Sequence, residues 1–162
     1  MKIAILSDSH DSWEDLSAAV AAASDESCEV LFFAGDLVRP AGVETLAEFF
    51  GPVHIIIGNN EFEVDEIHAA AAASDNVIYH GEVCDIQRKG IRIFMHHYPQ
   101  EATAKAQSGI YHLCIHGHTH RFTDRRVKGA RVLNPGAISY RGSAPSWGIF
   151  DTEDGSFTQQ SI

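Results

Sequence analysis

Seven positions that could bind a metal ion lie at the ends of short apolar segments of this chain. They are Asp8, His10, Asp36, Asn59, one of the adjacent residues His96 and His97, His118 and His120. Each follows an apolar run of the kind that forms a buried strand. In an α/β sheet the carboxyl ends of the strands border one crevice, where ligands bind. Carboxylate, imidazole and amide groups gathered there are the ligands of a hydrolase that uses two divalent ions.

The motifs around these residues are ambiguous when each is taken alone. Asp8 could cap the next helix, and Gly35-Asp36 and Gly58-Asn59 are ordinary turn sequences. Gly117-His118-Thr119-His120 is more specific, because two histidines one residue apart beside a glycine favour metal binding over a core position. The occurrence of all four motifs in this order, each at a strand end, indicates one common site.

Strand and helix patterns alternate along the first two thirds of the chain. We expect strands at 2–7, 30–34, 53–57, 77–79, 82–87, 91–95 and 112–115, and helices at 13–23, 41–50, 64–73 and 100–108. This alternation predicts βαβ units and a largely parallel core sheet. The last third contains two hairpin signals, Lys128-Gly129 and Asp154-Gly155, which predict a second, antiparallel sheet.

Composition narrows the class of protein. The length of 162 residues fits a single domain, 1–162. A formal net charge of −10 without a basic tract disfavours binding to a nucleic-acid polymer. No stretch approaches the ~18 apolar residues of a membrane span, and the N-terminus lacks a signal-peptide pattern. We therefore expect a cytoplasmic protein without a membrane partner.

The remaining histidines and the cysteines have simpler interpretations. Three cysteines without a CxxC motif argue against a disulfide framework, and Cys84 and Cys114 fall in apolar runs as inert buried thiols. Histidines away from the strand ends are expected to be structural or surface residues. These are His54, His68, His80 and His112.

Taken together, the motifs resemble those of the calcineurin-like metallophosphoesterases, and among these the small single-domain phosphodiesterases. The matching segments are Asp8-Ser9-His10, Gly35-Asp36, Gly58-Asn59, His96-His97, Gly117-His118-Thr119-His120 and Asn134-Pro135-Gly136. The resemblance runs from residue 2 to about residue 151. It implies an α/β fold of the αββα type, in which two sheets form a sandwich with helices outside.

The resemblance also implies how two ions would be held. Asp8, His10 and His120 would bind the first ion, Asn59, His118 and one of the paired histidines the second, and Asp36 both. We prefer His96 as the paired ligand, because a strand ending at Met95 places the next residue at the crevice. A register shifted by one would select His97. The donor set does not select one metal; we expect Mn²⁺, with Ni²⁺, Co²⁺, Zn²⁺ or Fe as alternatives.

The activity implied is phosphodiester hydrolysis by a metal-bound hydroxide that attacks phosphorus, with catalytic roles for Asp36, Asn59 and His10. Asn59 and Asn60 would lie beside a small phosphoester substrate. Related monoesterases have a histidine where this chain has Asn60, and an amide cannot protonate a leaving group. This departure favours diesters over monoesters with poor leaving groups.

Further expectations concern the substrate and partners. Arg141 follows the Asn134-Pro135-Gly136 segment and could contact a substrate phosphate. The family resemblance also implies self-association into a homo-oligomer. The alternative function is a protein-binding scaffold that resembles the small retromer subunit, in which the metal site is eroded. A complete set of ligand types favours the enzyme.

Overall fold

The protein is built on two β-sheets that pack face to face. The computed structural model describes residues 1–139 and 144–162, so Arg141 lies outside the described residues. The six-stranded sheet has the order β11-β10-β1-β2-β3-β4 and the five-stranded sheet the order β5-β6-β7-β9-β8. Their strands are β1 Lys2–Leu6, β2 Val30–Phe33, β3 Val53–Ile55, β4 Val77–Tyr79, β5 Val83–Arg88, β6 Ile91–His96, β7 Leu113–Ile115, β8 Thr123–Val127, β9 Ala130–Asn134, β10 Ser146–Asp151 and β11 Phe157–Ser161.

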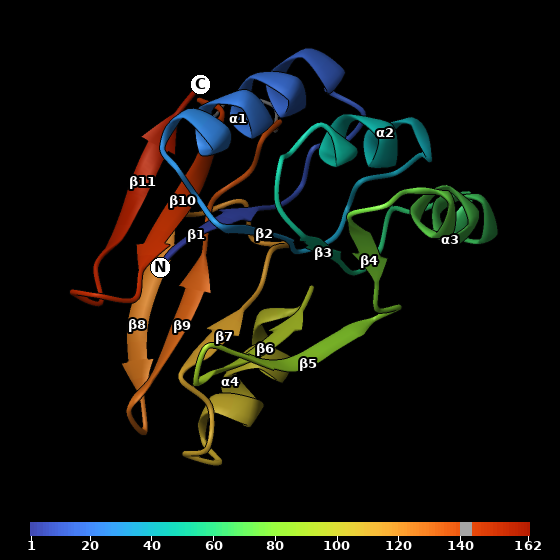
Figure 1. Ribbon diagram of the computed structural model, residues 1–162. Helices are drawn as coiled ribbons and strands as arrows, with labels where there is room; N and C mark the ends of the chain where they lie inside the picture. The colour runs from blue at the N-terminus through green and yellow to red at the C-terminus, as the bar shows by residue number, and fades with distance from the viewer. Residues whose placement is uncertain (140–143) are drawn as a thin grey trace.

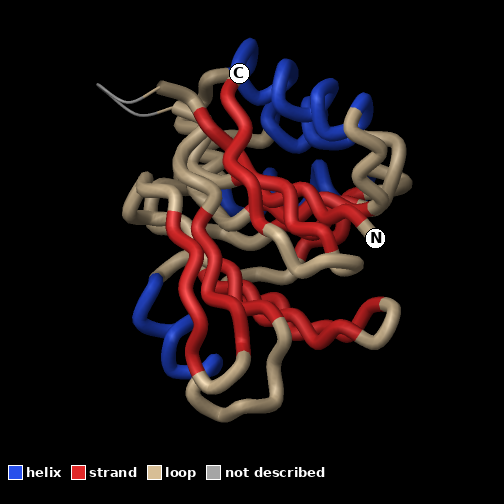
Figure 2. Tube along the Cα trace, turned by 90° about the vertical axis from the view of Figure 1, so that its left-hand side faces the viewer, coloured by secondary structure: helices blue, strands red, loops and turns tan. Residues whose placement is uncertain are grey.

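Among the residues that the structure describes, four helices cover the outer faces of the two sheets (Figures 1 and 2). They are α1 Trp13–Asp25, α2 Ala41–Ala47, α3 Val64–Ala73 and α4 Pro99–Ala106. In Figure 1 the first three lie above the six-stranded sheet and α4 lies below the five-stranded sheet. The fold is thus the predicted αββα sandwich. Within residues 1–139 and 144–162, no helix is both long enough and apolar enough to span a membrane.

Alternation along the strands separates three apolar clusters. Ala4 and Leu6 of β1 pack with the helices of the first layer, whereas Ile3 and Ile5 face the second sheet. This is the period of two that an extended strand imposes. Phe94 of β6 packs under α4, in a third cluster. Side chains from both sheets therefore form the core between them.

The two C-terminal hairpins correct one expectation. They do not form a sheet of their own: β9 pairs parallel with β7 in the five-stranded sheet, and β10 pairs antiparallel with β1 in the six-stranded sheet. The turn signal itself is confirmed, since Lys128 and Gly129 both have positive φ, as a two-residue hairpin turn requires. All five residues of β9 are buried, and its two edges pair with β7 and β8.

Candidate metal centre

Loops from both sheets form the site. Those after β1, β2 and β3 come from one sheet, and those after β6 and β7 from the other. The Asp8 amide donates to the Gly35 carbonyl at 3.0 Å, and the His10 amide to the Asp36 carbonyl at 3.2 Å. Five candidate ligands have left-handed backbone conformations: Asp8, His10, Asp36, His118 and His120. Such conformations are uncommon outside glycine and concentrate at functional sites.

The first cluster contains Asp8, His10, Asp36 and His120, whose potential ligand atoms all lie within 4.8 Å of one another. His120 Nε2 is 3.2 Å from Asp8 Oδ1 and 3.4 Å from His10 Nε2. His10 Nε2 is 3.8 Å from Asp36 Oδ2. Both carboxylates are fully buried, whereas the two imidazoles are partly exposed. The cluster is thus closed toward the core and open toward solvent.

The second cluster contains Asn59, His97 and His118. The Asn59 Oδ1 atom lies 3.0 Å from His97 Nε2 and 2.8 Å from His118 Nδ1. His97 Nδ1 is 2.7 Å from the Ala34 carbonyl, which only accepts, so Nδ1 donates its proton there. In the neutral ring Nε2 then has a lone pair, directed toward the other two residues. Three such donor groups around one point form a ligand set for a cation.

Asp36 lies between the clusters. Its Oδ2 faces His10, and its Oδ1 is 3.5 Å from His97 Nε2. Oδ1 also accepts from the Asn59 and Asn60 amides at 2.8 and 3.0 Å, and Oδ2 accepts from Asn60 Nδ2 at 2.6 Å. Burial raises the pKa of Asp36, but these bonds and the His97 ring overcome that effect and hold the pKa below its ordinary value. Asp36 is thus ionised and oriented toward both clusters.

The contacts of the paired histidines favour His97 over His96, the residue that we preferred from the sequence. His97 is 1% exposed and contacts Asn59, whereas His96 is partly exposed and its Nδ1 accepts from the Tyr98 amide at 3.1 Å. The reason is strand parity: β6 extends to His96, which follows Phe94 on the α4 side. His97 follows Met95, which faces the core between the sheets. The proposed ligand is therefore His97.

Two glycines permit the close approach of these loops. A Cβ at Gly58 would lie 2.2 Å from Asp36 Oδ1. A Cβ at Gly117 would lie 2.0 Å from Ser7 Oγ and 2.7 Å from Asp8 Oδ2. Any side chain at either position would displace a candidate ligand, which explains the glycine in each motif.

Two supporting residues were not assigned from the sequence. Glu61 accepts from the Leu37 amide at 3.0 Å and from the Gly58 amide at 2.8 Å, and so joins the loops that present Asp36 and Asn59. Burial, followed by the nearby Asp36 charge, raises the pKa of Glu61.

Asn134 is the second. It is fully buried, and its Nδ2 donates to the Gly117 carbonyl at 2.7 Å and to Thr119 Oγ1 at 3.0 Å. It therefore holds the His118–His120 loop. The Asn134-Pro135-Gly136 motif placed Asn134 near the site, but neither Glu61 nor Asn134 had a signal for these particular bonds.

The site favours positive charge. Burial lowers the pKa of His97, but the contact with Asp36 and the charges of Asp36 and Asp8 raise it above its ordinary value. Nitrogen and oxygen ligands bound at about 2.0–2.2 Å lie roughly 3 Å apart, close to the separations seen here. Divalent ions thus fit the donor atoms of both clusters.

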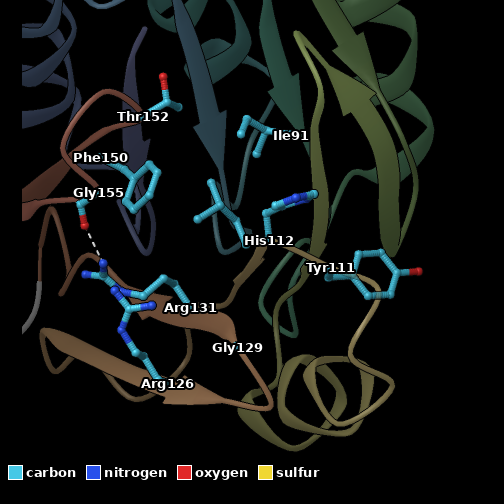
Figure 3. A pocket seen from close by; sticks show the side chains of 10 residues that line it. Ile91, Tyr111, His112, Arg126, Gly129, Arg131, Phe150, Thr152 and Gly155 are labelled. Atoms are coloured by element: carbon cyan, nitrogen blue, oxygen red, sulfur yellow. Dashed lines mark hydrogen bonds between the residues drawn. The ribbon is translucent and has the colours of Figure 1, made fainter.

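A separate cavity lies between the two sheets. Ile91, His112 and Phe150 are among the residues that line it (Figure 3). None of the candidate ligands lines it. Arg131 borders it, but Nε donates to Asp124 Oδ1 at 2.7 Å and Nη1 donates to the Gly155 carbonyl, the dashed line in Figure 3. These bonds within the protein occupy the guanidinium, so the cavity is not an equivalent site.

Comparison with known proteins agrees with this geometry. The calcineurin-like phosphoesterase superfamily domain matches residues 1–155. Phosphodiesterase MJ0936 of Methanocaldococcus jannaschii is 27% identical over 158 residues, which cover 94% of each chain. The structure of an archaeal phosphodiesterase superposes with a TM-score of 0.91 at 25% identity, over 100% of both chains. Zinc-bound Vps29 from Entamoeba histolytica shares the fold, with a TM-score of 0.65 at 18% identity over 100% of this chain and 98% of that one. The chain therefore belongs to the calcineurin-like phosphoesterase superfamily, as its motifs predicted.

Proposed function

We propose that this protein is a phosphodiesterase that depends on two divalent metal ions. The observation that supports this most directly is the position of Asp36, whose two carboxylate oxygens face two different groups of donor atoms. Membership of the superfamily and the likeness to phosphodiesterases support the same reaction class.

The residues divide into two ligand sets that share Asp36. Asp8, His10 and His120 would hold one ion, and Asn59, His97 and His118 the other. When bound, two such ions lower the pKa of a water molecule, neutralise phosphate oxygens and fix the substrate for in-line displacement. The protein orients this site through the hydrogen bonds that hold Asp36 and through Asn134 behind the His118 loop.

Asn60 supports a preference for diesters. Its amide Nδ2 donates to Asp36 Oδ2 at 2.6 Å, so it positions a ligand, and its second amide proton and Oδ1 leave the expected substrate contact as a prediction. An amide does not protonate a leaving group near neutral pH. Water would have to supply that proton, and substrates whose leaving group departs unaided are favoured.

The experiment is an assay of protein stripped of metal by a chelator and then reconstituted. Mn²⁺, Co²⁺ or Ni²⁺ should restore hydrolysis of a bis-aryl phosphate, while an alkyl phosphomonoester is cut slowly. Full activity in the stripped protein would contradict metal dependence. Equal rates on the two substrates would contradict the account of Asn60.

The second candidate function is a protein-binding scaffold, supported by the shared fold of Vps29. The complete set of donor residues favours the enzyme. In the same assay, protein that hydrolyses no ester even after reconstitution with metal would favour the scaffold.

A further inference from the structure

A second group of potential metal ligands shares no residue with the candidate metal centre. It consists of His54, His80 and Cys84, whose ligand atoms all lie within 4.8 Å of one another. His54 is in β3, His80 directly follows β4, and Cys84 is in β5. This is where the chain passes from the six-stranded to the five-stranded sheet (Figure 1).

The three side chains lie at the border of the core between the sheets. His54 is 7% exposed and stacks on Phe32, with ring centroids 4.9 Å apart. Its Nδ1 lies 2.9 Å from His80 Nε2. Cys84 is completely buried, and residues 1–139 and 144–162 offer its thiol no hydrogen bond within the usual limits. His80 is only partly buried, so solvent reaches the group from that side.

These positions suit a metal ion. Two nitrogens bound to Zn²⁺ at about 2.0–2.1 Å in tetrahedral geometry lie ~3.3 Å apart, so His54 Nδ1 and His80 Nε2, which are 2.9 Å apart, need to separate by only a few tenths of an ångström. Burial lowers the pKa of His54 to about 4 and also lowers the pKa of His80, which keeps both rings in the neutral form that binds metals. Two charged side chains lie near this group: Arg88, which is positive, acts on His54, and Asp85, which is negative, acts on Cys84.

We propose that His54, His80 and Cys84 bind a thiophilic divalent ion, Zn²⁺, in a structural site that joins the two sheets. Thiolate and imidazole are preferred Zn²⁺ ligands, and three protein ligands leave one position for water at the side of His80. Binding releases the Cys84 thiol proton to solvent, so that affinity rises with pH. The site is additional to the two ions proposed for catalysis and does not depend on that activity.

Cobalt titration of the metal-stripped protein tests this site specifically. Thiolate bound to Co²⁺ gives a charge-transfer absorption in the near ultraviolet, and none of the ligands proposed at the catalytic centre has sulfur. The wild-type protein should show the band. Cys84→Ser should lose it, whereas Cys114→Ser, which alters a buried free thiol in β7, should keep it.

A further variant covers the case in which Cys84→Ser does not fold, as judged by circular dichroism. His80→Gln changes a partly exposed ligand and should weaken the cobalt affinity read from the band at least tenfold. Absence of the band in wild-type protein, its persistence in folded Cys84→Ser, or an unchanged affinity in His80→Gln would overturn the proposal. In that case the pair would be a histidine–histidine hydrogen bond only.

Discussion

The Nε2 atom of His97 lies 3.0 Å from the Oδ1 atom of Asn59, although neither the amide oxygen nor the neutral ring nitrogen has a proton to share. The ring proton is on Nδ1, bonded to the Ala34 carbonyl at 2.7 Å. Two acceptors this close require a cation or a proton between them. The contact therefore supports the position that we propose for the second ion.

The paired histidines give the sharpest test of that assignment. His97→Ala should lower the metal content by one ion per chain relative to the wild-type protein and abolish most activity, because it removes a buried ligand. His96→Ala is the matched control. Because the His96 ring contacts the Tyr98 amide, its removal should leave both ions of the candidate centre in place. Metal analysis of the two purified proteins distinguishes them, and the reverse result would restore our original preference.

Asp36→Asn should have the largest effect of any single change at the site. It removes the charge that faces both clusters and places an NH₂ group near the donors of Asn59 or Asn60. Changes to residues behind a metal typically cost 10–100-fold, so loss of a shared ligand should lower kcat/KM by more than about 100-fold. Steady-state rates at saturating Mn²⁺ provide the measurement. A loss below tenfold would exclude a bridging role.

Glu61→Gln should loosen the two loops that Glu61 joins. The carboxylate accepts from Leu37 and Gly58, whereas a glutamine has one acceptor and directs its NH₂ at the other amide. We expect metal affinity to fall about 10–100-fold, as measured by titration of the stripped protein. Glu66→Gln, on the exposed face of α3, should not change it.

Asn60→His tests the missing acid. A histidine could donate to Asp36 and also protonate a leaving group, an effect worth ~10²–10⁴-fold. We expect a gain on alkyl monoesters up to that range, relative to Asn60→Ala, which loses the Asp36 bond without adding an acid. The measurement is the rate of hydrolysis of the same alkyl monoester by each of the two variants. Equal rates would contradict the expectation that a histidine at position 60 protonates the leaving group.

The buried thiols predict an alkaline loss of stability. Burial raises the pKa of Cys28 to about 11 and that of Cys114 to about 12. Thiols of the unfolded chain ionise near pH 9, so the unfolded state loses protons first and stability falls as pH rises above 9. Each thiol should cost about 1 kcal/mol between pH 9 and pH 10. The measurement is the free energy of unfolding by denaturant at pH 9 and pH 10. It should fall less in Cys114→Ser than in the wild-type protein, and an equal fall would contradict the assignment to the buried thiols.

Much of the fold was predictable because its patterns are local. The helix at 64–73 and the strand at 77–79 have the predicted bounds. The partners of the hairpins were not predictable in the same way, because pairing of β9 with β7 and of β10 with β1 depends on contacts distant in the chain. Turn chemistry specifies a hairpin but not the sheet that it joins.

The site shows the same limit at the level of single residues. Candidate ligands were identifiable by residue type, but the choice of His97 depended on whether β6 ends at residue 95 or 96. One residue reverses the direction of a side chain. Glu61 and Asn134 bind backbone groups of other loops, and side-chain identity alone does not reveal such partners.

The position of β1 has a consequence for the newly synthesised protein. Ile3 pairs with Val30 on one side and with Phe150 on the other. One edge of β1 therefore stays unpaired during synthesis until β10, Ser146–Asp151, has been made. Contacts so distant in sequence slow folding, and an open apolar edge promotes aggregation in the meantime. A chain that stops before β10 would leave that edge permanently open, so the β10–β11 hairpin is required to complete the six-stranded sheet.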